Sequence, residues 1–100
     1  MRKILVIGFM PYGYDQKLVE KNPDVIFFEE RSIAYSGDVN SIVELVDMMS
    51  GVMFMSEAGS ERLAWEVACI MKNKRVYEKS DFPIEDEKKE SEGDEDGKSV

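Results

Sequence analysis

One acidic residue, Glu66, lies inside a segment that is otherwise apolar and has the spacing of a helix. At about 100° per residue it falls near Leu63 and Ile70, at the edge of an apolar arc. A carboxylate among core-facing residues is costly unless something satisfies or uses it. Two interpretations follow. Glu66 pairs with Arg62 or Arg75 at the helix surface, or it is a positioned carboxylate that can attack a sugar carbon and form a glycosyl intermediate.

The remaining composition restricts the chemistry further. The 100 residues include no histidine, which removes the usual general base near neutral pH and the commonest metal ligand. The single cysteine, Cys69, excludes an intramolecular disulfide and fits a reducing compartment. Without a histidine to activate it, we expect Cys69 to be a small buried helix residue. Acidic residues show no spacing typical of a magnesium site, so the sequence predicts neither a metal nor a cofactor.

Short apolar runs alternate with segments of helical spacing along the first 84 residues. The runs predict strands at Lys3–Ile7, Val25–Phe28, Val52–Met55 and Arg75–Tyr77. Helices are predicted at Tyr14–Asn22, at Ile42–Met49 and at about Glu61–Asn73. Asp38 and Ser41 both fit as the N-cap of the second helix.

Two of the helices have faces that can be assigned from spacing. The second helix places four apolar residues on one face: Ile42, Leu45, Val46 and Met49. The third has a wide apolar arc of Leu63, Ala64, Val67, Ala68, Ile70 and Met71, and Trp65 and Cys69 extend it round the other side. We therefore expect the third helix to be largely covered.

This alternation predicts an α/β fold, a small Rossmann-like three-layer sandwich with a four-stranded, mainly parallel sheet. Right-handed crossovers place the loops after the strands at one edge, where such folds bind ligands. That edge would be lined by Gly8–Tyr14, Glu29–Ser32 and Ser56–Ser60. The substrate-binding residues expected there are Gly8, Phe9, Met10, Tyr14, Ser56 and Ser60. The glycine-bounded first loop lacks the patterns of phosphate-binding loops, so a simple strand-to-helix turn is favoured over phosphate binding.

The sequence divides into a domain at 1–84 and an acidic segment at 85–100. The acidic segment contains eight acids, three lysines and no aromatic residue, and accounts for five of the eight net negative charges. Such composition is typical of disordered, solvating tails. A sharper alternative is a tail that contacts a basic protein, for example by imitating nucleic acid. We expect no direct binding of nucleic acid.

No membrane association is expected. Every apolar run is too short to cross a bilayer. The first run, at Ile4–Ile7, is also too short for a signal peptide and has no small-residue cleavage site after it. The sequence therefore predicts a cytoplasmic protein.

The order of these features resembles the nucleoside 2-deoxyribosyltransferase-like superfamily, especially its small phage-associated members. The opening KILVIGFMPYG is similar to that family's first strand and its loop containing Gly and Pro. Later features match in order and spacing: Asp47, Val52–Met55, Ser60, Glu66, Ala68 and Lys74–Tyr77. Arg62 and Leu63 stand where the family pattern has Gly-Ala.

The resemblance implies roles for particular residues. Glu66 matches the family nucleophile that attacks C1′ of a deoxyribosyl group, and Ser60 matches a loop residue near the sugar or phosphate. Tyr12 or Tyr14 would orient the carboxylate. For Trp65, packing on a neighbouring helix or in a dimer contact is favoured over stacking on a base. Family members commonly assemble so that a neighbour completes the site, which implies a homo-oligomer.

Two classes of function follow. In the first, the domain binds a nucleoside or nucleotide and hydrolyses or transfers its N-glycosidic bond through Glu66. In the second, a non-catalytic protein sequesters a nucleotide in the same cleft, or binds a host factor through the cleft or the acidic segment. Release of a free base from nucleosides separates the first class from the second.

Overall fold

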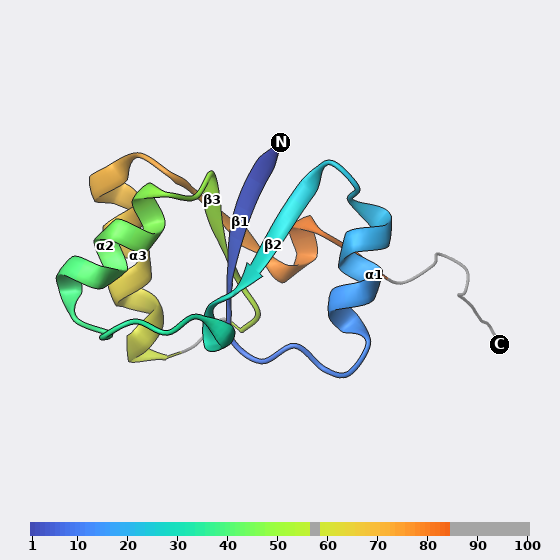
Figure 1. Cartoon of the computed structure of the whole chain (residues 1–100), viewed down its shortest axis with the longest axis horizontal. Coiled ribbons are helices and arrows are strands. Elements are labelled where there is room, and N and C mark those ends of the chain that lie inside the picture. Colours follow the sequence, from blue (N-terminus) through green and yellow to red (C-terminus); the bar gives the residue numbers. More distant parts are fainter. Residues whose placement is uncertain (57–58, 85–100) are drawn as a thin grey trace, which may run out of the picture.

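The computed structural model describes residues 1–56 and 59–84, and these form one sheet covered on both faces by helices (Figure 1). The sheet has four strands, all parallel, in the order β2-β1-β3-β4. The strands are β1 (Arg2–Ile7), β2 (Val25–Glu29), β3 (Gly51–Phe54) and β4 (Arg75–Glu78). The predicted three-layer α/β fold is thus confirmed, with a sheet that is wholly parallel.

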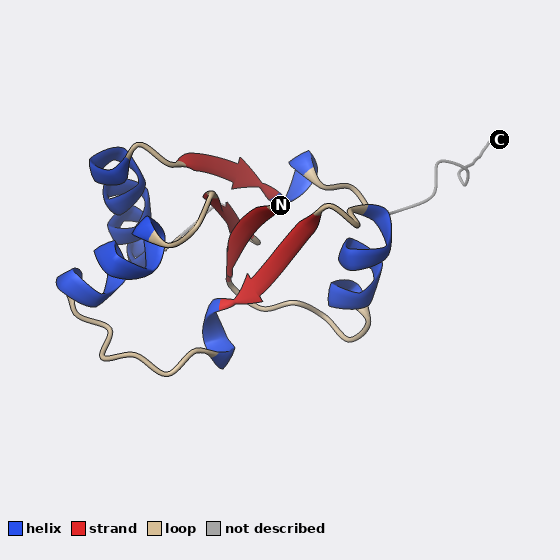
Figure 2. Cartoon of the chain, turned by 45° about the horizontal axis from the view of Figure 1, so that its top comes forward, coloured by secondary structure: helices blue, strands red, loops and turns tan. Residues whose placement is uncertain are grey.

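The helices lie on opposite sides of the sheet (Figure 2). They are α1 (Tyr14–Lys21), α2 (Val39–Asp47) and α3 (Ser60–Lys72). Figure 1 shows α2 and α3 side by side on one face and α1 on the other. Two short 3₁₀ turns, at Glu30–Ser32 and Lys79–Asp81, follow β2 and β4 and were not predicted.

Strand β1 is buried on both faces, as its continuous apolar sequence predicts. Leu5 and Ile7 pack in the core under α2 and α3, whereas Ile4 and Val6 pack in the core beside α1. Ile4, Leu5 and Val6 are fully buried. Because successive strand side chains point to opposite faces of the sheet, this one strand contributes residues to both cores.

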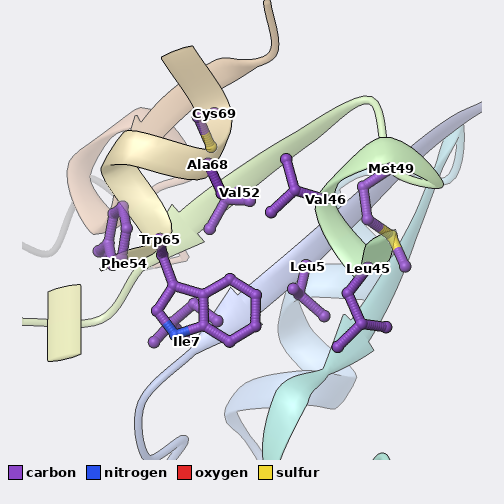
Figure 3. Close-up of a cluster of buried hydrophobic side chains, with 10 residues drawn as sticks. All are labelled: Leu5, Ile7, Leu45, Val46, Met49, Val52, Phe54, Trp65, Ala68 and Cys69. Atoms are coloured by element: carbon purple, nitrogen blue, oxygen red, sulfur yellow. The ribbon is translucent and has the colours of Figure 1, made fainter. Parts of the chain in front are cut away.

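The core under α2 and α3 centres on Trp65, which is fully buried (Figure 3). Ile7 belongs to the same core cluster, and the indole ring meets the ring of Tyr35 edge-on with centroids 6.1 Å apart. Among the described residues, Trp65 Nε1 has no hydrogen-bond partner. Trp65 therefore packs inside the molecule, in line with the favoured interpretation, and the alternative that it stacks on a base is wrong.

The expectation that α3 is largely covered is wrong. Trp65, Ala68 and Cys69 are buried, whereas Leu63 and Val67 on the predicted apolar arc are exposed. The two small residues let α3 approach the sheet closely, and the largest side chain of the helix fills the space beside them. In α2 the predicted face is correct, because Leu45, Val46 and Met49 are buried.

The core beside α1 is completed by the end of the described chain. Tyr14 and Leu18 of α1 pack there with Val25, Met53, Tyr77 and Phe82. The ring of Phe82 lies edge-on to Phe27, with centroids 5.5 Å apart. Since α1 alone has only eight residues, the segment after β4 is needed to cover this face of the sheet.

The chain reverses its direction of winding between β2 and β3, because β1 pairs with both of these strands. The carboxyl ends of β1 and β3 therefore form the topological switch point at which ligands bind in such folds. The acidic segment 85–100 lies outside the described residues. No helix in the part of the chain described here is long and apolar enough to cross a membrane.

Candidate functional site

A cavity of about 870 Å³ opens at the carboxyl ends of β3 and β4. It is lined by Phe54 at the end of β3 and by Met55 and Ser56 just after it. Arg62 and Glu66 of α3 and Tyr14 of α1 also line it. The rest of the lining comes from the end of β4 and the segment that follows it: Glu78, Lys79, Ser80, Phe82, Pro83 and Ile84. Residues from both faces of the sheet therefore meet at the edge where the sequence predicts binding.

Arg62 is the most highly connected side chain of this cavity. Its Nε donates to Glu66 Oε2 at 3.0 Å, and its Nη1 donates to the Ser56 carbonyl oxygen at 3.0 Å. Both terminal nitrogens donate to the Glu78 carboxylate, one of them at 3.1 Å to Oε1. The guanidinium also lies over the Phe54 ring, 4.3 Å from its centroid. The guanidinium thus binds one carboxylate through two parallel hydrogen bonds, binds a second carboxylate and stacks on a ring. These contacts need a planar group with several N–H donors, which lysine lacks.

These contacts stabilise the positively charged form of Arg62. The hydrogen bonds to Glu78, and then those to Glu66, raise the pKa of the guanidinium above its ordinary value. The side chain is 16% exposed, whereas the partner side chains Glu66 and Glu78 are 36% and 43% exposed. Both carboxylates are therefore more accessible to water than the guanidinium that they hold.

Glu66 satisfies parts of both interpretations drawn from the sequence. It pairs with Arg62 across one helical turn, as the surface ion-pair interpretation predicts. The alternative partner, Arg75, instead lies over the ring of Tyr77. Glu66 also lines the cavity, which the interpretation as a positioned carboxylate requires.

Three of the eight predicted site residues come together in this cavity: Tyr14, Ser56 and Glu66. Tyr14 is the first residue of α1 and is buried, with the Lys79 ammonium 5.7 Å from its ring centroid. Ser56 follows β3 and contributes its carbonyl oxygen to Arg62. Ser60 begins α3, and its side chain lies outside what the structure describes.

The remaining predicted residues lie elsewhere along the same edge. Tyr12 and Met10 line a second hollow of about 430 Å³. The Tyr12 side chain is fully exposed, and Phe9 is exposed with the Arg31 guanidinium 5.5 Å from its ring centroid. Gly8 has φ 112°, and a Cβ added at this position would lie 3.0 Å from the Cβ of Met55. A glycine is therefore needed here for the backbone conformation and for its close approach to Met55. Tyr12 and Glu66 thus belong to different hollows.

Sequence reasoning missed Glu78, the last residue of β4, and Lys79 and Phe82 of the segment after it, which all line the cavity. The apolar run that predicts the last strand ends at Tyr77, but the strand continues to Glu78. The rule that ligand sites lie at the carboxyl ends of parallel strands would have included Glu78 had the strand been extended by one residue.

The charges around the cavity cancel. Arg62 and Lys79 supply two positive charges, and Glu66 and Glu78 supply two negative ones. Within residues 1–56 and 59–84, no three acidic or cysteine side chains are grouped so that they could hold a metal ion. The described lining therefore has carboxylates that can accept hydrogen bonds from a ligand, but it has no net positive charge to attract an anion.

Comparison of the chain with models of known protein families, with curated proteins and with solved structures finds no match. The resemblance to deoxyribosyltransferase-like proteins therefore rests on the residues of this chain alone.

Proposed function

We propose that the cavity at the carboxyl ends of β3 and β4 binds a nucleoside. The observation that carries the proposal is the lining itself, in which the Glu66 and Glu78 carboxylates face an open space beside aromatic and apolar side chains. Carboxylate oxygens accept hydrogen bonds from sugar hydroxyls and from the amino groups of bases. Apolar atoms of Met55, Pro83 and Ile84 offer contact area for a planar ring.

A nucleoside fits this cavity better than a nucleotide does. The charges of the lining cancel, so a phosphate would gain no net attraction there. Arg62 is the natural phosphate ligand by residue type, but two carboxylates already hold its nitrogens. The first loop also lacks the glycine amides that cradle phosphates.

Calorimetric titration with deoxynucleosides, ribonucleosides and their monophosphates tests this proposal. We expect nucleosides to bind and their monophosphates to bind at least about tenfold more weakly, since about 1.4 kcal/mol of repulsion or desolvation is enough for that ratio. Glu66→Gln removes the charge of one lining carboxylate and should weaken nucleoside binding. Glu44→Gln changes an exposed acid of α2 outside the cavity and should not. Equal binding by the two variants would remove Glu66 from the site.

Cleavage of the N-glycosidic bond is a second candidate function, favoured by the position of Glu66 at the cavity wall. In such a reaction a carboxylate oxygen of Glu66 bonds to C1′ of the sugar while the bond from C1′ to the base nitrogen breaks. The base leaves with that electron pair and takes up a proton from water. Attack by water, or by a second base, at C1′ then releases the sugar and restores the carboxylate.

Chromatography of nucleosides incubated with the protein separates binding from turnover. Release of free base that is lost in Glu66→Gln and kept in Glu44→Gln would establish the reaction. Binding without any release of base would leave a sequestering protein. Base release that persists in Glu66→Gln would exclude this residue as the nucleophile.

A further inference from the structure

Glu66 and Glu78 hold Arg62 in different ways. Glu66 accepts a single hydrogen bond, from Arg62 Nε at 3.0 Å. Glu78 accepts from both terminal nitrogens, with Nη1 at 3.1 Å from its Oε1 and Nη2 bonded to its Oε2. Two parallel hydrogen bonds of this kind are also how an arginine binds a phosphate. Glu78 therefore occupies the part of Arg62 that could bind an anion, whereas Glu66 does not.

The backbone of Glu78 is fixed where β4 ends. Glu78 is the last residue of β4, and the 3₁₀ turn at Lys79–Asp81 follows it. The Asp81 carboxylate accepts a hydrogen bond from the Glu78 backbone N–H at 2.7 Å. Because the strand and this hydrogen bond both hold the Glu78 backbone, its carboxylate starts from a fixed point beside Arg62.

The other contacts of Arg62 do not depend on Glu78. Nη1 also donates to the Ser56 carbonyl oxygen at 3.0 Å, and the guanidinium lies over the Phe54 ring, 4.3 Å from its centroid. Together with the bond from Nε to Glu66, these contacts hold the guanidinium from three sides. Without the Glu78 carboxylate, the two terminal nitrogens would therefore remain in the cavity wall with a place for an anion beside them.

The net charge of the lining depends on Glu78 as well. Arg62 and Lys79 supply two positive charges against the two negative charges of Glu66 and Glu78. Without the charge of Glu78, two positive charges and one negative charge would remain. A cavity with a net positive charge attracts anions, whereas the present lining does not.

We propose that Glu78 is the residue that determines the preference of this cavity for uncharged ligands, because its carboxylate takes the place of a phosphate on Arg62. Arg62 is thus an anion-binding residue that the chain keeps occupied from within. The inference deepens the proposed function and rests on it, since it concerns the choice between a nucleoside and its monophosphate.

Calorimetric titration of the full chain with inorganic phosphate tests the role of Glu78 without any nucleoside. Glu78→Gln and Glu66→Gln remove the same charge, but only Glu78→Gln releases both terminal nitrogens of Arg62 from a carboxylate. We expect Glu78→Gln to bind phosphate at least about tenfold more tightly than the wild type or Glu66→Gln does, because charge-assisted hydrogen bonds contribute on that order. Adding Arg62→Gln to Glu78→Gln should abolish the gain.

Three results would overturn the proposal. Phosphate could bind the wild type as tightly as it binds Glu78→Gln, Glu66→Gln could gain as much affinity as Glu78→Gln, or the gain could survive the loss of Arg62. The second result would mean that net charge alone decides. Circular dichroism establishes that each variant is folded, and if Glu78→Gln does not fold, Glu78→Ala replaces it in the same titrations.

Titration with a deoxynucleoside and its monophosphate separates this inference from the proposed function. In Glu78→Gln the monophosphate should bind more tightly than the nucleoside, which reverses the order expected for the wild type. If no nucleoside binds the wild type while Glu78→Gln gains phosphate binding, the proposed function is wrong and Glu78 still blocks Arg62. If nucleosides bind the wild type while Glu78→Gln gains affinity for neither phosphate nor the monophosphate, the inference about Glu78 alone is wrong.

Discussion

The guanidinium of Arg62 separates two carboxylates, those of Glu66 and Glu78, that lie on different elements at the end of the sheet. Where the deoxyribosyltransferase-like pattern has small residues, this chain has an arginine that connects α3 to β4 and to the β3 carboxyl end. Removing it would leave two partly covered carboxylates to repel each other. Arg62 therefore has a structural role as well as a place in the cavity wall.

We expect Arg62→Ala to lower the free energy of unfolding by about 1–3 kcal/mol, because hydrogen bonds to charged groups contribute on that order and the exposed carboxylates are screened by water. Arg62→Lys should recover part of the lost stability, because lysine keeps the positive charge. The recovery should be incomplete, because an ammonium cannot bind Glu78 through two parallel hydrogen bonds. Urea denaturation measures both. Arg2→Ala is the control, because its ion pair with Asp24 spans 3.6 Å between exposed groups and should contribute about 0–1 kcal/mol. Equal losses in Arg62→Ala and Arg2→Ala would contradict the structural role.

Cys69 gives a prediction about reactivity and pH. Burial, and secondarily the negative charge of Glu66, raises the pKa of its thiol from 9.0 to about 11. At pH 8 the thiolate fraction should therefore be about 100-fold smaller in the folded chain than in the unfolded one, and labelling by a thiol reagent should be correspondingly slower.

The raised pKa of Cys69 also makes stability depend on pH. The protonated thiol contributes its full share of the free energy of unfolding below pH 9, and this contribution is lost as the pH rises toward 11. An added exposed cysteine, Val19→Cys, should label rapidly; comparable labelling at position 69 would refute the burial argument.

At the scale of elements, the strands were predictable because each is a short apolar run ended by a polar or glycine residue. The core face of α3 was not predictable from spacing, because the helix carries two apolar arcs and periodicity cannot rank them. Tertiary packing decides, since Trp65 and the small Ala68 and Cys69 fit between the sheet and α2. The same limit applies to the site: Glu66 was identifiable as an isolated acid, whereas Glu78 required knowledge of where β4 ends.

The start of α2 provides a prediction at this scale. Asp38 is its N-cap, and its carboxylate accepts a hydrogen bond from the Ser41 backbone N–H at 2.8 Å. That bond, followed by those from the Ser41 and Ser36 hydroxyls, lowers the pKa of Asp38 below its ordinary 3.8. Asp38→Ala should therefore lower the urea midpoint at pH 7, while Asp38→Asn should largely preserve it, because asparagine also caps helices.

The pH dependence of this cap has a definite sign. A lowered pKa contributes stability above the ordinary aspartate value, and the contribution disappears as the pH falls through the folded-state pKa. The difference between the wild type and Asp38→Ala should accordingly shrink below pH 4. A difference that stays constant from pH 7 to pH 3 would mean that the carboxylate charge has no part in capping α2.

At the scale of the whole molecule, the two faces of the sheet are covered in different ways. Two helices cover one face, whereas α1 shares the other with the segment after β4. Phe82 is 5% exposed and contacts two rings, with centroids 5.5 Å from that of Phe27 and 5.1 Å from that of Tyr77. The last described residues therefore belong to the folded domain, and the same side chain forms part of the cavity wall.

We expect Phe82→Ala to lower the free energy of unfolding by about 3–5 kcal/mol, as for other buried phenylalanines. Phe9→Ala is the matched control, because Phe9 is 65% exposed and should change stability by less than about 0.5 kcal/mol. Truncation after Ile84 should also leave the free energy of unfolding nearly unchanged, since it removes only the acidic segment.

Urea denaturation of the three variants locates the domain boundary. If truncation after Ile84 costs as much as Phe82→Ala, the boundary lies beyond residue 84 and the acidic segment contributes to the fold. If Phe82→Ala is neutral, α1 covers its face of the sheet unaided.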